Sequence, residues 1–323
     1  MYFALQSAFS SSLPDRRMQL SIHNLSKTYP NGTRALDDIS LDIPAGMFGL
    51  LGRNGAGKST LIRTLATLQE PDAGSAVLTD TNGPSIDVIR EKTRVRQTLG
   101  YLPQTFGFHP RVRAERLLEH FAILKGIAEP ATRRHAVESL LRRTNLWDVR
   151  KQKIGTFSGG MRQRFGVAVA LLGAPSLIIV DEPTAGLDPE ERVRFLNLLS
   201  EIGEESVVIL STHIVEDVEE LCTRIAIIDS GKILLSDEPG AAIAQLRGKI
   251  WQRSVTRDEL AALERELRVV STKRLAGRTL VRVHATDAPP AKFEPVEPDL
   301  KDVYFMMMST HRSDVPNLPE PAR

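Results

Sequence analysis

The sequence predicts an α/β protein built around a mainly parallel sheet, and three observations lead to that class. Short apolar runs, which are typical of buried strands, occur at residues 48–51, 99–102, 177–180, 207–210 and 225–228. Helical stretches separate these runs, and strands that alternate with helices indicate a parallel sheet. The chain has 323 residues, of which 41% are hydrophobic and 25% are charged, and this composition excludes collagen-like and wholly disordered proteins.

Two predicted strands precede that alternation. Residues 18–25 alternate between apolar and polar side chains, as a half-buried strand does, and residues 36–43 form a second such segment. The Tyr-Pro-Asn-Gly segment at 29–32 predicts the turn that joins them. Residues 1–17 are Ser-rich and lack periodicity, so we expect a disordered tail, or a true start at Met18.

A helical insert interrupts the α/β pattern at about residues 105–160. Apolar residues recur there at helical spacing, first at Leu117, Leu118, Phe121 and Leu124, and then at Val137, Leu140 and Leu141. The main domain is expected to span residues 18–238.

After Pro239 the composition changes, and a small α+β accessory domain is predicted over residues 239–310. Its expected strands are residues 250–255 and 280–283, its first helix is residues 257–267, and its last helix is centred on residues 303–308. Residues 311–323 are Pro-rich and are expected to be a disordered tail.

Charge, cysteine content and hydropathy narrow the function classes. Lys and Arg number 42 against 40 for Asp and Glu, so the net charge of +2 disfavours a dedicated nucleic-acid-binding protein. The one cysteine, Cys222, excludes an internal disulfide, and packing is favoured over a nucleophilic role for it. The longest uncharged run, residues 165–180, is shorter than the ~20 apolar residues that a spanning helix needs, and Gly173 and Pro175 break it.

Residues 52–59, Gly-Arg-Asn-Gly-Ala-Gly-Lys-Ser, match the phosphate-binding P-loop pattern. The glycines let backbone N–H groups point at phosphate oxygens, and the following helix adds its N-terminal dipole. We expect Lys58 to reach the β- and γ-phosphates and Ser59 to offer its hydroxyl to Mg²⁺. A simple Gly-rich turn is the alternative, which the flanking strand and helix disfavour. The residues predicted to bind nucleotide here are Gly52, Asn54, Gly55, Gly57, Lys58, Ser59 and Thr60.

A second motif is the buried strand that ends in Asp181 and Glu182. Its acids fall at the carboxyl edge of the sheet, where α/β folds bind their ligands. Asp181 is predicted to hold Mg²⁺, and Glu182 to orient or deprotonate the attacking water. Taken alone, the two acids could simply cap a helix. The P-loop elsewhere in the sequence favours the catalytic interpretation.

Residues 157–164, Phe-Ser-Gly-Gly-Met-Arg-Gln-Arg, begin a predicted helix upstream of Asp181. Together with the P-loop, Gln104 and His213, they closely resemble the nucleotide-binding domain of ABC transporters over about residues 18–236. The resemblance implies a P-loop NTPase core with an N-terminal antiparallel β subdomain and a helical insert. It also implies ATP and Mg²⁺ as cofactors, with Ser158, Gly159 and Gly160 acting on ATP held by a second copy of the domain.

The resemblance assigns further roles one residue at a time. Tyr29 matches the aromatic residue that stacks on adenine, Gln104 the residue that contacts Mg²⁺ and the attacking water, and His213 the γ-phosphate contact. Each residue also has a purely structural alternative. Tyr29 could simply belong to the turn, Gln104 could be an amide in a surface loop, and His213 could be a core histidine whose hydrogen bonds are made within the protein. Lys58, Gln104, Glu182 and His213 are thus the expected catalytic residues, and Ser59, Gln104 and Asp181 the expected metal ligands. The segment from Gly186 to Asp188 resembles the loop that touches the opposite protomer.

The signature segment departs from the usual Leu-Ser-Gly-Gly-Gln of the family at two positions. Phe157 replaces Leu, and Met161 replaces Gln, whose amide hydrogen bonds Met cannot make. The Ser-Gly-Gly centre is intact, so activity is expected. A Met at this position and a long C-terminal addition that ends in Asp302-Val-Tyr-Phe305 are two features that resemble the ATP-binding subunits of bacterial drug and polysaccharide exporters.

The resemblance implies the ATP-hydrolysing subunit of a transporter, more in keeping with export than import. We expect a peripheral protein at the cytoplasmic face of the inner membrane, with separate permease subunits as partners and no nucleic acid. Phe106, Phe108 and His109 are candidate permease contacts, although both phenylalanines could equally be core residues. The alternative is a soluble ABC-type ATPase acting on ribosomes or nucleic acid. Such proteins usually carry two domains or a long coiled-coil insertion, and this chain has neither.

Overall fold

The structure is a computed structural model, and it describes residues 18–80, 83–105, 107–184, 187–202, 206–275, 277–289 and 292–314. The predicted tail at residues 1–17, Phe106, Gly186 and residues 315–323 lie outside these ranges. Within the described part of the chain, no helix is long and apolar enough to cross a membrane.

A six-stranded sheet forms the centre of the main domain, in the order β10-β9-β3-β8-β7-β6. Its members are β3 (Gly46–Leu51), β6 (Leu99–Leu102), β7 (Leu177–Asp181), β8 (Val207–Thr212), β9 (Arg224–Asp229) and β10 (Lys232–Asp237). All neighbours pair in parallel except β10, which runs antiparallel to β9 at the edge. The predicted α/β class with a mainly parallel sheet is confirmed.

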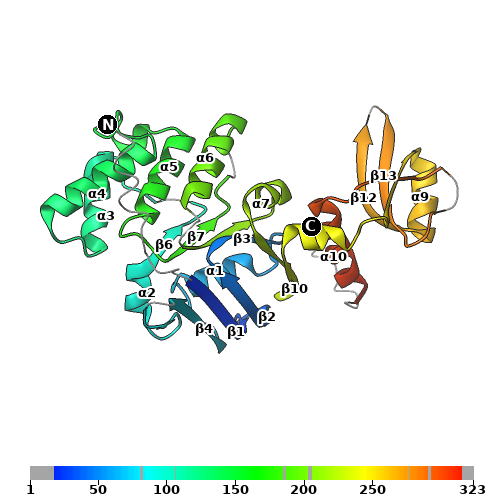
Figure 1. The fold of residues 1–323 in the computed structure, drawn as a ribbon, viewed down its shortest axis with the longest axis horizontal. Coiled ribbons are helices and arrows are strands. Elements are labelled where there is room, and N and C mark those ends of the chain that lie inside the picture. The colour runs from blue at the N-terminus through cyan, green and yellow to red at the C-terminus, as the bar shows by residue number, and fades with distance from the viewer. Residues whose placement is uncertain are drawn as a thin grey trace, which may run out of the picture.

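A second, antiparallel sheet covers one face of this layer (Figure 1), in the order β2-β1-β4-β5. It consists of β1 (Met18–Thr28), β2 (Arg34–Pro44), β4 (Ala73–Asp80) and β5 (Ile86–Asp87). Leu20 lies opposite Ile43 in the β1–β2 pair, so the apolar side chains of the two strands reach one core. That core also includes Phe48 and Leu50 of β3, which fixes the strand before the P-loop.

Helices α1 (Lys58–Leu65) and α2 (Lys92–Thr98) pack in the core that the two sheets share. Helices α5 (Gly159–Ala170), α6 (Pro189–Ile202) and α7 (Val215–Leu221) cover the opposite face of the central sheet (Figure 1). The insert is built from α3 (Ala114–Leu124), α4 (Pro130–Arg143) and a 3₁₀ turn at Ile154–Thr156. Helices α3, α4 and α5 share their own apolar cluster. Phe108 packs edge-to-face on Phe165 in that cluster, with ring centroids 5.1 Å apart, which favours its reading as a core residue.

The C-terminal part forms a third sheet, in the order β12-β13-β11-β14. Its elements are α8 (Pro239–Ala244), β11 (Ile250–Val255), α9 (Arg257–Glu266), β12 (Arg268–Leu275), β13 (Arg278–His284), β14 (Glu294–Pro295) and α10 (Leu300–Asp314). Figure 1 shows the β12–β13 hairpin and α9 projecting to one side, with α10 between them and α7.

Helix α10 joins this C-terminal part to the main domain. Its buried residues Leu300, Val303 and Tyr304 belong to the same apolar cluster as Ile225 and Ile227 of β9. Lys301 forms an ion pair of 2.5 Å with Glu216 of α7. Apolar packing is therefore continuous across residue 238, and α10 extends to Asp314, beyond the position where the sequence places the start of a tail.

Candidate functional site

A pocket of about 480 Å³ opens where the P-loop meets the carboxyl ends of the central strands. It brings together sequence-predicted residues from five separate segments: Tyr29, Asn54, Gly55, Gly57, Lys58, Ser59, Thr60, Gln104, Glu182 and His213. Gln104 is exposed and follows β6, Glu182 follows β7, and His213 follows β8. The parallel sheet thus gathers residues that are far apart in the sequence at one edge, as the motif order predicts.

The conformation of the P-loop depends on its last glycine. Gly57 has φ +112°, and a Cβ on it would lie 2.6 Å from the carbonyl oxygen of Ala35. A side chain at this position would therefore be strained and would clash with β2. Gly57 also caps α1, whose first turn contains no acidic residue, so the partial positive charge of the helix N-terminus is left for an anion.

Lys58 is the buried cation of the pocket. Only 5% of the residue is exposed, and its amine donates to the carbonyl oxygens of Gly52 at 2.6 Å and Arg53 at 3.3 Å. The amine also lies 3.5 Å from Oε1 of Glu182. Burial lowers the pKa of Lys58, and the carboxylate of Glu182 opposes that shift. A phosphate group that entered here would offer this ammonium stronger acceptors than the two carbonyls.

The two carboxylate oxygens of Glu182 contact two different side chains, the amine of Lys58 and the imidazole of His213. Its Oε1 faces Lys58, and its Oε2 lies 2.7 Å from Nδ1 of His213. The residue has φ +48°, a left-handed conformation that is uncommon for a glutamate and that clusters at functional sites. A carboxylate fixed in this way at the pocket wall has the chemistry of a general base, because it can accept a proton from a bound water.

Asp181 ends β7 immediately before Glu182 and does not line the pocket itself. It is 8% exposed, and burial raises the pKa of its carboxyl group, while Ser211 and Lys58 oppose the shift. Within the described ranges, no three His, Cys, Asp or Glu side chains are grouped closely enough to hold a metal ion. A Mg²⁺ held by Asp181, Ser59 and Gln104 would therefore need phosphate oxygens as further ligands. Proteins usually bind Mg²⁺ in this way, with few side chains and the phosphates of the substrate.

Tyr29 lies at the edge of the pocket, in the turn that follows β1. Its hydroxyl is 3.2 Å from Oγ1 of Thr60 and donates to Oε1 of Gln69 at 3.2 Å. The two contacts hold the ring beside the first turn of α1. A flat aromatic surface in this place suits stacking against a planar base.

The signature segment lies apart from this pocket. Ser158 caps α5 by accepting a hydrogen bond from the backbone N–H of Met161 at 3.1 Å. None of Ser158, Gly159 and Gly160 is among the described residues that line the pocket, and both Ser158 and Gly159 are exposed. Met161 packs against the apolar cluster of the insert, which explains a hydrophobic residue where the family usually has Gln.

Asp188, at the end of the predicted contact loop, caps α6. Its Oδ1 accepts a hydrogen bond from the backbone N–H of Glu191 at 2.8 Å. Gly186 of the same segment lies outside the described residues. His109, the other candidate permease contact, is exposed.

Sequence reasoning missed Arg53 as a pocket residue. Arg53 lines the pocket, and its guanidinium lies beside the hydroxyl of Tyr304 on α10. Burial raises the pKa of Tyr304, and the nearby Arg53 opposes that shift. The position of Arg53 inside the P-loop is the only sequence signal for it, since nothing in the sequence connects it with Tyr304.

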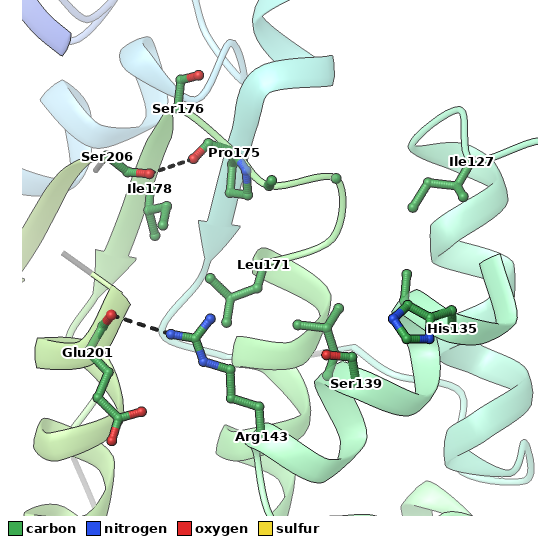
Figure 2. Close-up of a pocket in the computed structure, with 14 residues that line it drawn as sticks. Ile127, His135, Ser139, Arg143, Leu171, Pro175, Ser176, Ile178, Glu201 and Ser206 are labelled. Atoms are coloured by element: carbon green, nitrogen blue, oxygen red, sulfur yellow. Dashed lines mark hydrogen bonds between the residues drawn. The ribbon is translucent and has the colours of Figure 1, made fainter. Parts of the chain in front are cut away.

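A larger pocket of about 600 Å³ lies between α4, the α5–β7 connection and α6 (Figure 2). It contains none of the predicted site residues. Its titratable side chains, His135, Arg143 and Glu201, are all exposed. Arg143 donates to the backbone oxygen of Glu201 at 3.3 Å, and the hydroxyl of Ser206 donates to that of Pro175 at 2.8 Å.

Both the sequence and the fold of the chain are similar to those of known proteins. The family model described as ABC transporter matches residues 36–185. The doxorubicin resistance ATP-binding protein DrrA of Mycobacterium tuberculosis is 34% identical over 244 residues, which cover 75% of this chain and 72% of DrrA.

Two solved structures are also similar. The dimeric post-hydrolysis state of the ATP-binding cassette MJ0796, bound to ADP and Pi, has a TM-score of 0.60 and 26% identity, and the match covers 68% of this chain and 98% of that one. The cbiO1 protein from Clostridium perfringens, part of the ABC transporter complex cbiONQ, has a TM-score of 0.61 and 28% identity, with 70% and 90% coverage.

Proposed function

This chain belongs to the ABC transporter family of ATP-binding proteins, and from that premise we propose that it hydrolyses ATP between two copies of itself to drive export through separate membrane subunits. The observation that carries the proposal is the buried pair of Lys58 and Glu182 beside a P-loop, with the exposed His213 bonded to the same carboxylate. Charges are buried together in this way where a site must bind and change a charged ligand.

We assign the nucleotide to the 480 Å³ pocket. The P-loop amides and Lys58 would hold the phosphates, and Tyr29 would stack on the base. Ser59, Gln104 and Asp181 would hold Mg²⁺, which would supply positive charge to the phosphate oxygens. Glu182 would take the proton of the attacking water, with His213 keeping its carboxylate in place. Most of the rate enhancement in such a reaction comes from positioning and charge stabilisation.

The second copy is proposed because the signature segment lies away from the pocket of its own chain. Ser158 and Gly159 are exposed at the N-terminus of α5, where a helix offers N–H groups to an anion. A partner chain could bring its γ-phosphate to this end of the helix. The MJ0796 relative is described as dimeric, which supports such an arrangement.

Separate membrane subunits are proposed as the other partners, with this chain on the cytoplasmic face of the membrane. The cbiO1 relative is described as part of a transporter complex, and DrrA is named for resistance to a drug. By the same reasoning a drug-like compound is the favoured cargo, and export the favoured direction.

Affinity purification from solubilised membranes, followed by mass spectrometry, tests this proposal. We expect the full chain to recover a strongly hydrophobic protein and to sediment with membranes only when that protein is co-expressed. Sedimentation with ribosomes, independent of any membrane protein, would contradict the proposal and support a soluble ATPase that acts on ribosomes.

A further inference from the structure

The turn that follows β7 carries Glu182 in a left-handed conformation, with φ +48°. An L side chain keeps this conformation only where the surrounding structure determines it. Three described contacts hold the turn, and each comes from a different element. The first is a backbone contact: the N–H of Glu182 donates to the carbonyl oxygen of Ser211 in β8 at 2.8 Å.

The second contact is a buried hydrogen bond from Thr184, two residues after Glu182. Its hydroxyl donates to Oδ2 of Asp217 in α7 at 2.6 Å. Asp217 has no exposed surface, and its other oxygen accepts from Nε of Arg192 in α6 at 2.8 Å. A carboxylate buried to this degree is stable only when it is paired and hydrogen-bonded, so its position is closely fixed.

The third contact comes from the signature helix. The side-chain amide of Gln163 in α5 donates to the carbonyl oxygen of Pro183 at 2.7 Å. Pro183 lies between Glu182 and Thr184, so the turn is held on both sides of its centre.

We propose that Thr184, Asp217 and Gln163 are positioning residues for hydrolysis, which hold the carboxylate of Glu182 against His213 at the mouth of the nucleotide pocket. The inference rests on the proposed function, in which Glu182 is the general base. Asp217 lies four residues after His213, and Thr184 two residues after Glu182. Their bond therefore joins the two chain segments that carry the 2.7 Å pair. None of the three residues lines the nucleotide pocket, so they act on the rate and not on ATP binding.

Steady-state ATP hydrolysis by the full chain tests this assignment through Thr184→Val, which keeps the volume and removes the hydroxyl. We expect kcat to fall about tenfold or more, since small misplacements of a reacting group have effects of this size, while KM for ATP stays within twofold. Thr184→Ser restores the hydroxyl and should return kcat to within about threefold of the wild-type value.

Thr144→Val is the matched control. Thr144 is also buried, and its hydroxyl donates one hydrogen bond, to the carbonyl oxygen of Leu140 at 2.8 Å, in the helical insert. Its kcat should stay within twofold of wild type. An equal loss of kcat in Thr144→Val and Thr184→Val would show a general structural effect and would overturn the inference, as would a parallel rise in KM.

Glu182→Gln separates this inference from the proposed function. If Glu182→Gln is inactive and Thr184→Val turns over at the wild-type rate, the positioning role is refuted and the proposed function stands. If Glu182→Gln itself turns over normally, the proposed base is wrong and the inference fails with it. Should Thr184→Val not fold, Gln163→Met provides the test: a several-fold lower kcat at unchanged KM supports the role, and an unchanged kcat overturns it.

Discussion

Two pockets in the described part of the chain differ in the residues that line them more than in their volumes. The nucleotide pocket has about 480 Å³, and the pocket between α4, the α5–β7 connection and α6 has about 600 Å³ (Figure 2). In the smaller one, Lys58 and Glu182 are buried within 3.5 Å of each other, and Glu182 adopts a strained backbone conformation. In the larger one, His135, Arg143 and Glu201 are exposed to solvent.

This difference has a physical meaning. An exposed arginine is solvated by water and needs no partner, whereas a buried charge at a pocket wall, where a ligand can reach it, indicates a functional site. The size of a pocket is therefore a weak guide to function in this chain. Buried charges that line the pocket and contact one another are the better guide.

The largest expected effect separates the two pockets directly. Lys58→Ala should lower ATP turnover at least about 100-fold, because it removes the buried cation that the P-loop brings to the phosphates. Arg143→Ala, in the larger pocket, should leave turnover within twofold of wild type. ATPase assays on both purified variants, with circular dichroism as the check on folding, decide the matter. A similar loss of ATP turnover in the two variants would contradict the functional difference between the two pockets.

Asp302 is a buried acid that lies outside both pockets, so it shows what a buried charge does where no ligand can reach it. Asp302 of α10 is 1% exposed, and burial raises its pKa to about 6, with the charge of Asp299 adding to the shift and Arg282 opposing it. Its Oδ2 accepts from the backbone N–H of Asp299 at 3.0 Å and lies 3.1 Å from Arg282. These contacts cap α10 and connect it to β13, so the role of Asp302 is structural.

The expected pH effect follows from that raised pKa. The native state keeps its proton on Asp302 up to about pH 6, and the unfolded state releases it near pH 4, so the native state is favoured at low pH. The contribution of Asp302 to the free energy of unfolding should fall by about 2 kcal/mol between pH 4.5 and 6.5. Denaturant unfolding should show this slope reduced in Asp302→Asn, with ATPase activity unchanged. An identical slope in both proteins would contradict the assignment.

The smallest expected effect concerns residues 1–17. Because the predicted first strand begins at Met18, deleting these residues should change Tm by less than about 1 °C, which corresponds to a few tenths of a kcal/mol. Thermal unfolding of the full and shortened chains measures this difference. A loss of several degrees would show that the segment packs on the domain.

The parallel strands of the central sheet and the motif residues of the pocket could be predicted because each is encoded by residues that are close together in the sequence. Each buried parallel strand is a short apolar run, and the P-loop and the Asp181–Glu182 pair are contiguous motifs. Strands β4, β5, β10, β12 and β14 were missed. All except β4 lie at sheet edges, where side chains such as Lys232, Lys273 and Arg274 are exposed and the apolar pattern is broken. Strand β4 lies inside its sheet, but only two of its eight residues are buried, so its apolar pattern is weak as well.

Contacts between distant residues were beyond the reach of the sequence. Thr184 and Asp217 are separated by 33 positions, and Arg53 lies in the P-loop whereas Tyr304 lies in α10. Such pairs arise from how α7 and α10 pack on the central sheet. No local pattern of residues encodes that packing, so these contacts became visible only in three dimensions.

In the proposed mechanism, the signature segment of a second copy completes the nucleotide site. Glu182→Gln keeps the shape of the side chain and removes its basicity, and losing a general base typically lowers a rate 10²–10⁴-fold. ATP should still bind, and the closed pair should accumulate because hydrolysis no longer reopens it.

Size-exclusion chromatography of Glu182→Gln with and without ATP measures this directly. We expect a shift from monomer to dimer when ATP is added, and loss of that dimer when Ser158→Arg is introduced as well, because a bulky side chain would then occupy the exposed end of α5. A Glu182→Gln protein that binds ATP normally and remains monomeric at saturating ATP would contradict the account.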